Sequence, residues 1–190
     1  MQRSPAPSSG ASCLKVFKKF VKSLGGFYLC LHTLSLTPMT KKLLLVAAVL
    51  ILGAQLFQPT RNESLDESPD DIMVRYNVPE PIQITLKKAC YDCHSNHTVY
   101  PWYSYVQPVG WWLNHHVEEG KEHLNFSEFG NYPLKKADHK LEEVMESQET
   151  HWMPMDSYTW MHPEAKLTEE ERLALINWAK SLRSTLNQTP

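Results

Sequence analysis

The amino-acid sequence predicts an all-α fold, and three observations support this prediction. Apolar side chains recur at spacings of three and four residues in several segments, which is typical of helices with one buried face. Thr168 and Glu171 match a capping box, and the first turn that follows is acidic. No segment sustains the alternating pattern of a β-strand. With 190 residues, of which 42% are apolar, the chain suffices for one compact domain with extensions.

Four longer helices are expected in the C-terminal two thirds of the chain. The first begins near Pro79 and reaches Cys90, and the second runs from near Pro108 to His123. The third sets an apolar face against Lys and Glu residues, and the fourth follows Thr168. Residues 150–166 are predicted to form a loop. The apolar positions that define the four helices are Ile82, Leu86, Ala89, Leu134, Ala137, Leu141, Val144, Met145, Leu173, Leu175, Ile176, Trp178, Ala179 and Leu182.

An apolar segment, residues 43–57, precedes these helices and is interrupted only by Gly53 and Gln55. As a helix it would be about 22 Å long, short of the ~30 Å hydrocarbon core of a bilayer, which indicates a signal-peptide core or a short membrane anchor. The basic pair at residues 41–42 is expected to stay on the inner side of the membrane. We favour an uncleaved anchor over residues 39–58, because a cleavage site after Ala54 would place Leu52 where a small residue is needed.

Residues 1–38 would make an unusually long leader, whereas Met39 begins a signal of ordinary proportions. We therefore interpret Met39 as the start of the protein and residues 1–38 as upstream reading frame. The alternative is a basic amphipathic segment that lies on the inner leaflet. Residues 59–73 are polar, acidic and rich in turn-forming residues, which predicts a linker. The globular domain is expected to span residues 74–186.

Charge is distributed unevenly along the chain. Seven of the 19 Lys and Arg residues fall within residues 1–42, which contain no acidic residue. The rest of the chain carries 12 Lys and Arg against 21 Asp and Glu, a formal charge of −9. A domain this acidic repels phosphate backbones, so we expect no nucleic-acid partner. The four cysteines are too few for a disulfide-stabilised scaffold of this length.

Residues 90–94, Cys-Tyr-Asp-Cys-His, form a C-x-x-C-H motif. This spacing is typical of c-type haem attachment, in which Cys90 and Cys93 reach the two vinyl groups of one porphyrin and His94 becomes the proximal iron ligand. The alternatives are a Cys₂His₂ zinc site, a thioredoxin-like dithiol and a plain disulfide. The zinc site would lack a second cysteine pair, and the dithiol would lack its βαβ setting. The motif therefore predicts one covalently attached haem c, which in bacteria is joined to the protein outside the cytoplasmic membrane.

Further short motifs surround the C-x-x-C-H. They are residues 89–96 (ACYDCHSN), 100–103 (YPWY), 107–108 (QP), 112 (W), 116–120 (HVEEG), 124–127 (LNFS), 153–154 (MP), 158–160 (YTW) and 162–163 (HP). In these motifs the chain, from about residue 75 to 183, resembles the haem-binding domain family of exported bacterial proteins, a relative of class I cytochrome c. The resemblance implies a small cytochrome c-like helical fold around one covalent haem, with a cytochrome or a peroxidase as redox partner. It implies no particular reaction.

The second axial ligand of the iron is expected from the loop that precedes the last helix. Cytochromes c commonly use a methionine sulfur from a loop well downstream of the C-x-x-C-H. Met153 occupies that place, and Pro154 stiffens the loop. The main alternative is His116, and Met155, His151, His162 and an open or water-bound site also remain. The aromatic residues expected around the haem are Trp112 and Trp160, with Trp102, Trp111 and Tyr158.

The identity of this ligand decides the expected function. A Met/His pair saturates the iron and raises its reduction potential, which suits electron transfer. We therefore expect a membrane-tethered monohaem cytochrome on the periplasmic side of the bacterial cytoplasmic membrane, an electron carrier rather than an enzyme. An open distal side would instead favour a haem-based sensor or ligand-binding module, or a peroxidase-like protein in which His116 or His151 serves as acid–base group or hydrogen-bond donor.

Overall fold

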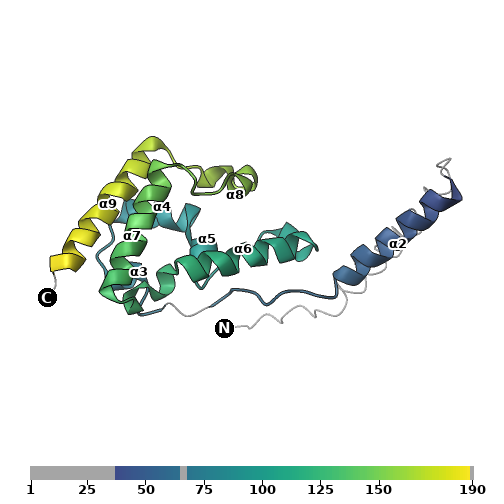
Figure 1. The fold of residues 1–190 in the computed structure, drawn as a ribbon, viewed down its shortest axis with the longest axis horizontal. Helices are drawn as coiled ribbons and strands as arrows, with labels where there is room; N and C mark the ends of the chain where they lie inside the picture. Colours follow the sequence, from purple (N-terminus) through teal and green to yellow (C-terminus); the bar gives the residue numbers. More distant parts are fainter. Residues whose placement is uncertain (1–36, 65–67, 189–190) are drawn as a thin grey trace, which may run out of the picture. The chain divides into compact units, whose positions relative to one another are not determined.

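The computed structural model describes residues 37–64 and 68–188, so nearly all of the predicted upstream extension, residues 1–38, lies outside the described residues. The described residues are helical and contain no strand, which confirms the predicted all-α class (Figure 1); one isolated bridge pairs Glu63 with His97. The helices are α2 (Pro38–Ala54), α3 (Ile72–Arg75), α4 (Glu80–Ala89), α5 (Tyr91–His94), α6 (Val109–His123), α7 (Leu134–Glu149), α8 (Asp156–Met161) and α9 (Glu169–Gln188), with 3-10 helices η1 (Trp102–Tyr105), η2 (Phe126–Asn131) and η3 (Pro163–Ala165).

The apolar segment near the N-terminus forms α2, which belongs to a separate compact unit from the residues that begin at Phe57. Thr37 caps the helix, since its hydroxyl oxygen accepts a hydrogen bond from the backbone N–H of Thr40 at 3.4 Å. None of the side chains of α2 is buried. Among the described residues, no helix combines the length and the apolar character needed to cross a membrane.

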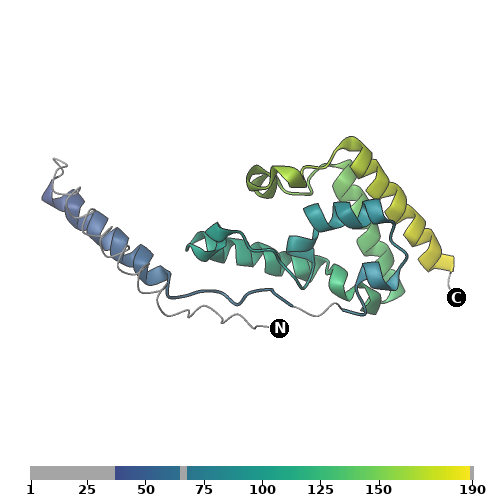
Figure 2. The same cartoon turned by 180° about the vertical axis from the view of Figure 1, so that it is seen from behind.

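The helices α7 and α9 lie side by side and form the largest helix–helix contact of the domain (Figures 1 and 2). Leu141 of α7 and Leu175 and Ala179 of α9 are buried there. At the far end, the Arg183 guanidinium donates two hydrogen bonds to the Asp138 carboxylate, at 2.9 and 3.0 Å. The four predicted longer helices are therefore present. Leu134 and Leu173, which were expected on the buried faces, are both more than half exposed.

A single carboxylate joins the start of α9 to α4. The Thr168 hydroxyl accepts from the Glu171 N–H at 3.3 Å, and the Glu171 carboxylate accepts from the Thr168 N–H at 2.9 Å, which confirms the predicted capping box. The other oxygen of Glu171 accepts from the ammonium group of Lys88, near the end of α4. The Lys88 ammonium holds the pKa of Glu171 below its usual value. This ion pair therefore joins α4, the helix that leads into the C-x-x-C-H motif, to α9.

Two segments differ from their expected form. Residues 150–166, expected as a loop, contain α8 and η3, which are too short to show helical periodicity in the sequence. The N-terminal part of the predicted linker lies on the domain, because the Asn62 amide donates to the Ser95 carbonyl and to the Thr98 hydroxyl, each at 2.8 Å. The Lys121 ammonium in turn donates to the Asn62 side-chain oxygen at 2.6 Å.

The α7–α9 contact can be tested with Leu141→Ala, which removes a fully buried side chain. We expect the free energy of unfolding to fall by about 2–5 kcal/mol, because the substitution leaves a cavity in the core. Leu134→Ala, on the same helix but with a side chain 53% exposed, is the matched control and should change it by less than about 1 kcal/mol. Chemical denaturation of both variants measures the difference, and equal losses would contradict this description of the core.

Candidate functional site

The C-x-x-C-H motif spans the junction of α4 and α5, and α6 crosses it at very short range. A Cβ atom at Gly120 of α6 would lie 2.6 Å from the Cys93 carbonyl oxygen and 3.1 Å from the Cys93 Cβ. Real Cβ atoms do not approach backbone oxygen that closely. Glycine is therefore the residue that lets α6 pack directly on the motif.

His94 is held by the residue that ends α6. Its Nδ1 lies 2.9 Å from the carbonyl oxygen of Leu124, and a carbonyl can only accept, so Nδ1 carries the proton and Nε2 keeps its lone pair. Burial lowers the pKa of His94, and hydrogen bonds to the carbonyls of Leu124 and Gly120 offset only part of that effect. The imidazole is therefore neutral at pH 7. A ring nitrogen held by a carbonyl on one side and free on the other is the usual arrangement of a metal-ligating histidine.

The two thiols of the motif are free and half-buried. Burial, with a contribution from Cys93, raises the pKa of Cys90 to about 12, and burial together with the nearby Asp92 raises the pKa of Cys93 to about 11. Reactive dithiols work through thiolates at neutral pH, which requires pKa values below the ordinary range. These thiols have the opposite shift, which argues against a thioredoxin-like role.

Two adjoining cavities open beside the motif, with volumes of about 240 and 400 Å³. The first lies toward α6 and the start of α8, and the second toward α7 and α9. Together they reach the size of sites that hold cofactors. Figures 1 and 2 show α6 and α8 on either side of this region, with α5 at its base. The residues that line both cavities are Ala89, Cys90, His94, His123, Trp152 and Met153.

Met153, from the segment between α7 and α8, lines both cavities beside the motif. Arg172 of α9 holds this loop, because its Nη1 donates to the Met153 carbonyl at 2.8 Å and to the Gln148 side chain at 2.9 Å. The Arg172 side chain is more than nine-tenths buried, and its Nε finds no hydrogen-bond partner among the described residues. Burying a guanidinium costs free energy, and the hydrogen bonds to Gln148 and Met153 offset part of that cost. These two bonds hold the loop in one position.

The Asp92 side chain ties the motif to α8. It accepts a hydrogen bond from the Tyr158 hydroxyl at 2.7 Å and one from the Val99 N–H at 3.1 Å. The Tyr158 ring stacks on the His162 ring, with centroids 4.5 Å apart. Burial and the bond to Asp92 raise the pKa of Tyr158, so its hydroxyl stays protonated. The wall of the cavity formed by α8 is thus fixed relative to the two thiols.

The structure brings some of the expected residues together and leaves others outside. His116 lines the smaller cavity, where its ring packs on Trp112 with centroids 4.3 Å apart, and Met155 lines it as well. Trp112 and Trp160 line neither cavity and are exposed, Trp160 to 83%, so their contact with a haem stays a prediction. The exposure of these two side chains depends on tertiary packing, which the sequence pattern does not reveal. His151 bonds Glu169 and His162 bonds Tyr103, and neither lines a cavity.

Several residues of the site were not expected from the sequence. Trp152, Gly120 and Arg172 were assigned no role there, and His123, which the sequence indicated to be solvated, lies at the rim of both cavities. Gly120 belongs to one of the short motifs, residues 116–120, and Trp152 directly precedes Met153, so the sequence positions of both residues could have indicated that they belong to the site. For Arg172, a cation in the helix after an acidic cap, nothing in the sequence indicated burial.

The alternative of a zinc centre finds no support in the described residues, because none of their His, Cys, Asp and Glu side chains gather in groups of three or more that could hold a metal ion. A porphyrin iron needs only axial ligands from the protein, and His94 and Met153, which line the same cavities, are candidates for this role. The two thiols, the neutral imidazole and the apolar cavity therefore fit a haem.

Comparison with known proteins agrees with this geometry. Neither the curated proteins nor the solved structures contain a match to the chain. A family model, described as a haem-binding domain, matches residues 49–181, which is more than half of the 190 residues and includes the whole of the site. The chain therefore belongs to the haem-binding domain family.

Proposed function

We propose that the chain carries one haem c and acts as a monohaem electron carrier. The observation that carries this proposal is that two thiols, an imidazole with a free Nε2 and a methionine line one cavity. Family membership supports the haem itself. The covalent attachment, the axial pair and the redox role are inferences from the residues.

Attachment would use the thiols of Cys90 and Cys93. Each thiol would add its S–H across one vinyl group of the haem, an addition that balances without an oxidant or a reductant. Their positions three residues apart, at the start and in the third position of the α5 region, put both sulfurs on one wall of the cavity. The close approach of α6 at Gly120 supports that wall from behind.

The axial ligands would be His94 and Met153. A bound haem supplies an iron atom that gains or loses one electron. His94 is held in the required tautomer by the Leu124 carbonyl, and Met153 is held by Arg172. An iron with two protein ligands has no free position for a substrate, and a thioether ligand favours the reduced state. Both properties suit electron transfer.

A second candidate function, a haem-based sensor or ligand-binding module, has one observation in its favour. His116, His123 and Glu119 line the smaller cavity along α6, and such polar groups could hydrogen-bond a small molecule on the iron. A peroxidase-like activity would need the same open position. Ligand binding by the reduced protein therefore separates these functions from electron transfer.

We further propose that the domain works on the periplasmic side of the bacterial cytoplasmic membrane, attached there through α2, and exchanges electrons with redox proteins on that side. The support is the basic pair Lys41–Lys42 ahead of an apolar helix with no buried side chain, together with the export that haem c attachment requires.

Covalent attachment is tested by the double variant Cys90→Ala/Cys93→Ala. We expect haem staining of the denatured band to disappear, because no thioether remains to hold the porphyrin during electrophoresis. Ser181→Ala, an exposed position of α9 outside the motif, is the control and should stain like the parent. A parent chain, matured in a host that attaches haem c, whose band does not stain would contradict the proposal.

The distal ligand is tested by Met153→Ala beside Met155→Ala, two methionines of the same cavity. Met153→Ala should keep its haem, lose the optical signature of sulfur ligation, lower the reduction potential and bind carbon monoxide rapidly. Met155→Ala should behave like the parent, which should bind carbon monoxide slowly. Rapid binding by the parent would instead select the ligand-binding function, and an unchanged spectrum of Met153→Ala would transfer the ligand role to His116.

The role of Arg172 is tested by Arg172→Lys, which keeps the charge but cannot hold Gln148 and Met153 with one planar group. We expect a loss of about 1.5–3 kcal/mol in stability and a smaller fraction of sulfur-ligated iron, with the haem still attached. The control is Arg183→Lys, which alters a partly exposed pair with Asp138. A destabilised Arg172→Lys with a fully parental spectrum would limit Arg172 to a structural role.

A further inference from the structure

The start of α6 and the preceding η1 carry a group of exposed apolar side chains. This group, which we name the aromatic tip, consists of Trp102, Tyr105, Val106, Val109, Trp111 and Trp112. Trp102 alone is 78% exposed. Six large apolar side chains that are each at least 39% exposed within residues 102–112 are a concentration that favours contact with something other than water. None of these residues lines the cavities beside the C-x-x-C-H motif.

The aromatic tip is also free of charge, although the part of the chain beyond residue 42 has a formal charge of −9. Residues 98–117 contain no Lys, Arg, Asp or Glu. The charged side chain that packs on these residues is a cation, Arg61. Its guanidinium lies 4.4 Å from the ring centroid of Tyr100 and 4.0 Å from the ring centroid of Tyr105. A surface without acidic groups is not repelled by a negatively charged partner surface.

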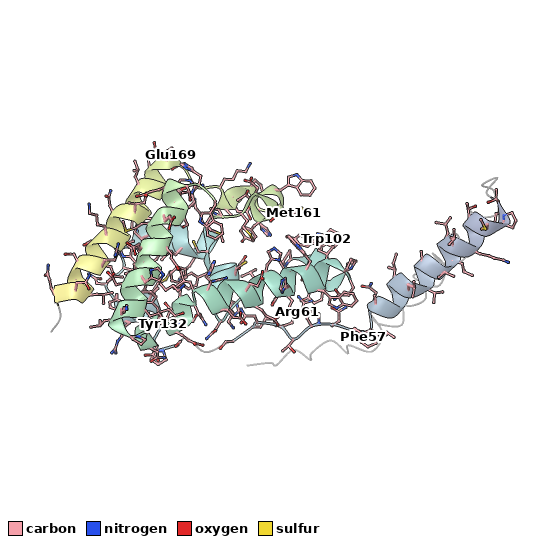
Figure 3. The ribbon with its side chains drawn as sticks, viewed as in Figure 1. Phe57, Arg61, Trp102, Tyr132, Met161 and Glu169 are labelled. Atoms are coloured by element: carbon pink, nitrogen blue, oxygen red, sulfur yellow. The ribbon has the colours of Figure 1, made fainter. Side chains whose placement is uncertain are left out.

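The chain enters the domain at this tip. The Trp111 indole N–H donates to the Phe57 carbonyl at 2.7 Å, and the Gln58 side chain donates to the Tyr105 carbonyl at 3.3 Å. The Arg61 guanidinium donates to the Ser104 hydroxyl at 2.9 Å. Figure 3 shows Phe57, Arg61 and Trp102 at the same end of α6. Residues 43–60, which lead into this point and include most of α2, contain no charged side chain.

We propose that the aromatic tip rests in the headgroup layer of a phospholipid membrane. Trp and Tyr favour this layer because their rings are apolar at one end and polar at the other. The uncharged character fits a lipid surface better than a transient redox protein, since such partners are guided by opposite charges. A second reason for a lipid surface is that residues 43–60, which include most of the apolar helix α2, lead in the sequence directly to the segment bound at the aromatic tip. This inference rests on the proposed membrane location and not on the axial ligands.

Oxidative footprinting of the full haem-loaded chain tests the proposal at the level of single residues. The probe is a vesicle of phosphatidylcholine and phosphatidylglycerol, and the measurement is the modification rate of each tryptophan by mass spectrometry. Trp160 is the matched internal control, because it is 83% exposed and lies outside the tip. On vesicles, we expect the rate at Trp102 to fall at least fivefold relative to Trp160, with Trp111 and Trp112 protected as well.

A double variant gives the complementary measurement. Trp102→Ser/Val106→Ser should lower binding of the full chain to the same vesicles about tenfold. Trp160→Ser/Leu173→Ser, which removes two side chains that are even more exposed but lie outside the tip, should leave the binding unchanged. Equal modification of Trp102 and Trp160 on vesicles would overturn the proposal. Protection of Trp102 in buffer without lipid, rising with protein concentration, would overturn it in favour of a second copy of the chain. The haem spectrum and the haem stain, recorded on the same samples, report separately on the proposed function.

Discussion

The site depends on the contact between α6 and the C-x-x-C-H motif, where the chain tolerates no side chain at residue 120. This contact places the end of α6 over the motif, so that the carbonyl of Leu124 reaches His94. One short-range approach of two backbones therefore decides the tautomer of the imidazole, and with it which nitrogen is free to bind iron. A larger residue at position 120 would separate the helices and remove the hydrogen bond together with the wall of the cavity.

A second part of the cavity lining, around Met153, is held by contacts with α9. Met153 belongs to a loop that a buried cation of α9 fixes, and α9 is in turn joined to α4 by the Glu171 carboxylate. The α7–α9 pair thus acts as a frame for both walls: α4 delivers the thiols to one side and the α7–α8 loop delivers the thioether to the other. A cofactor between them would contact segments about 60 residues apart in the sequence, which explains why a small domain can enclose it.

Features of the fold that depend on residues close together in the sequence could be predicted from the sequence. The motif at residues 90–94, the capping box at Thr168 and the long helices are each defined by neighbouring residues, and the structure contains the helices and the capping box as predicted. Met153 was singled out because it directly precedes Pro154 in the segment before the last helix, and it lines both cavities beside the motif; its role as a ligand stays a prediction. The exposure of Trp112 and Trp160 could not be predicted, because the exposure of an aromatic ring depends on which distant helix covers it, and their contact with a haem stays a prediction. Arg172 was missed for the same reason.

The raised pKa values of the two motif thiols have a consequence for the protein before its cofactor is attached. Because burial raises the pKa of both thiols, they stay protonated at pH 7 in this fold. Disulfide formation starts from a thiolate, so protonation of both thiols disfavours a bond between Cys90 and Cys93. The fold thereby favours the reduced form of both sulfurs, which is the form that the proposed thioether bonds would require.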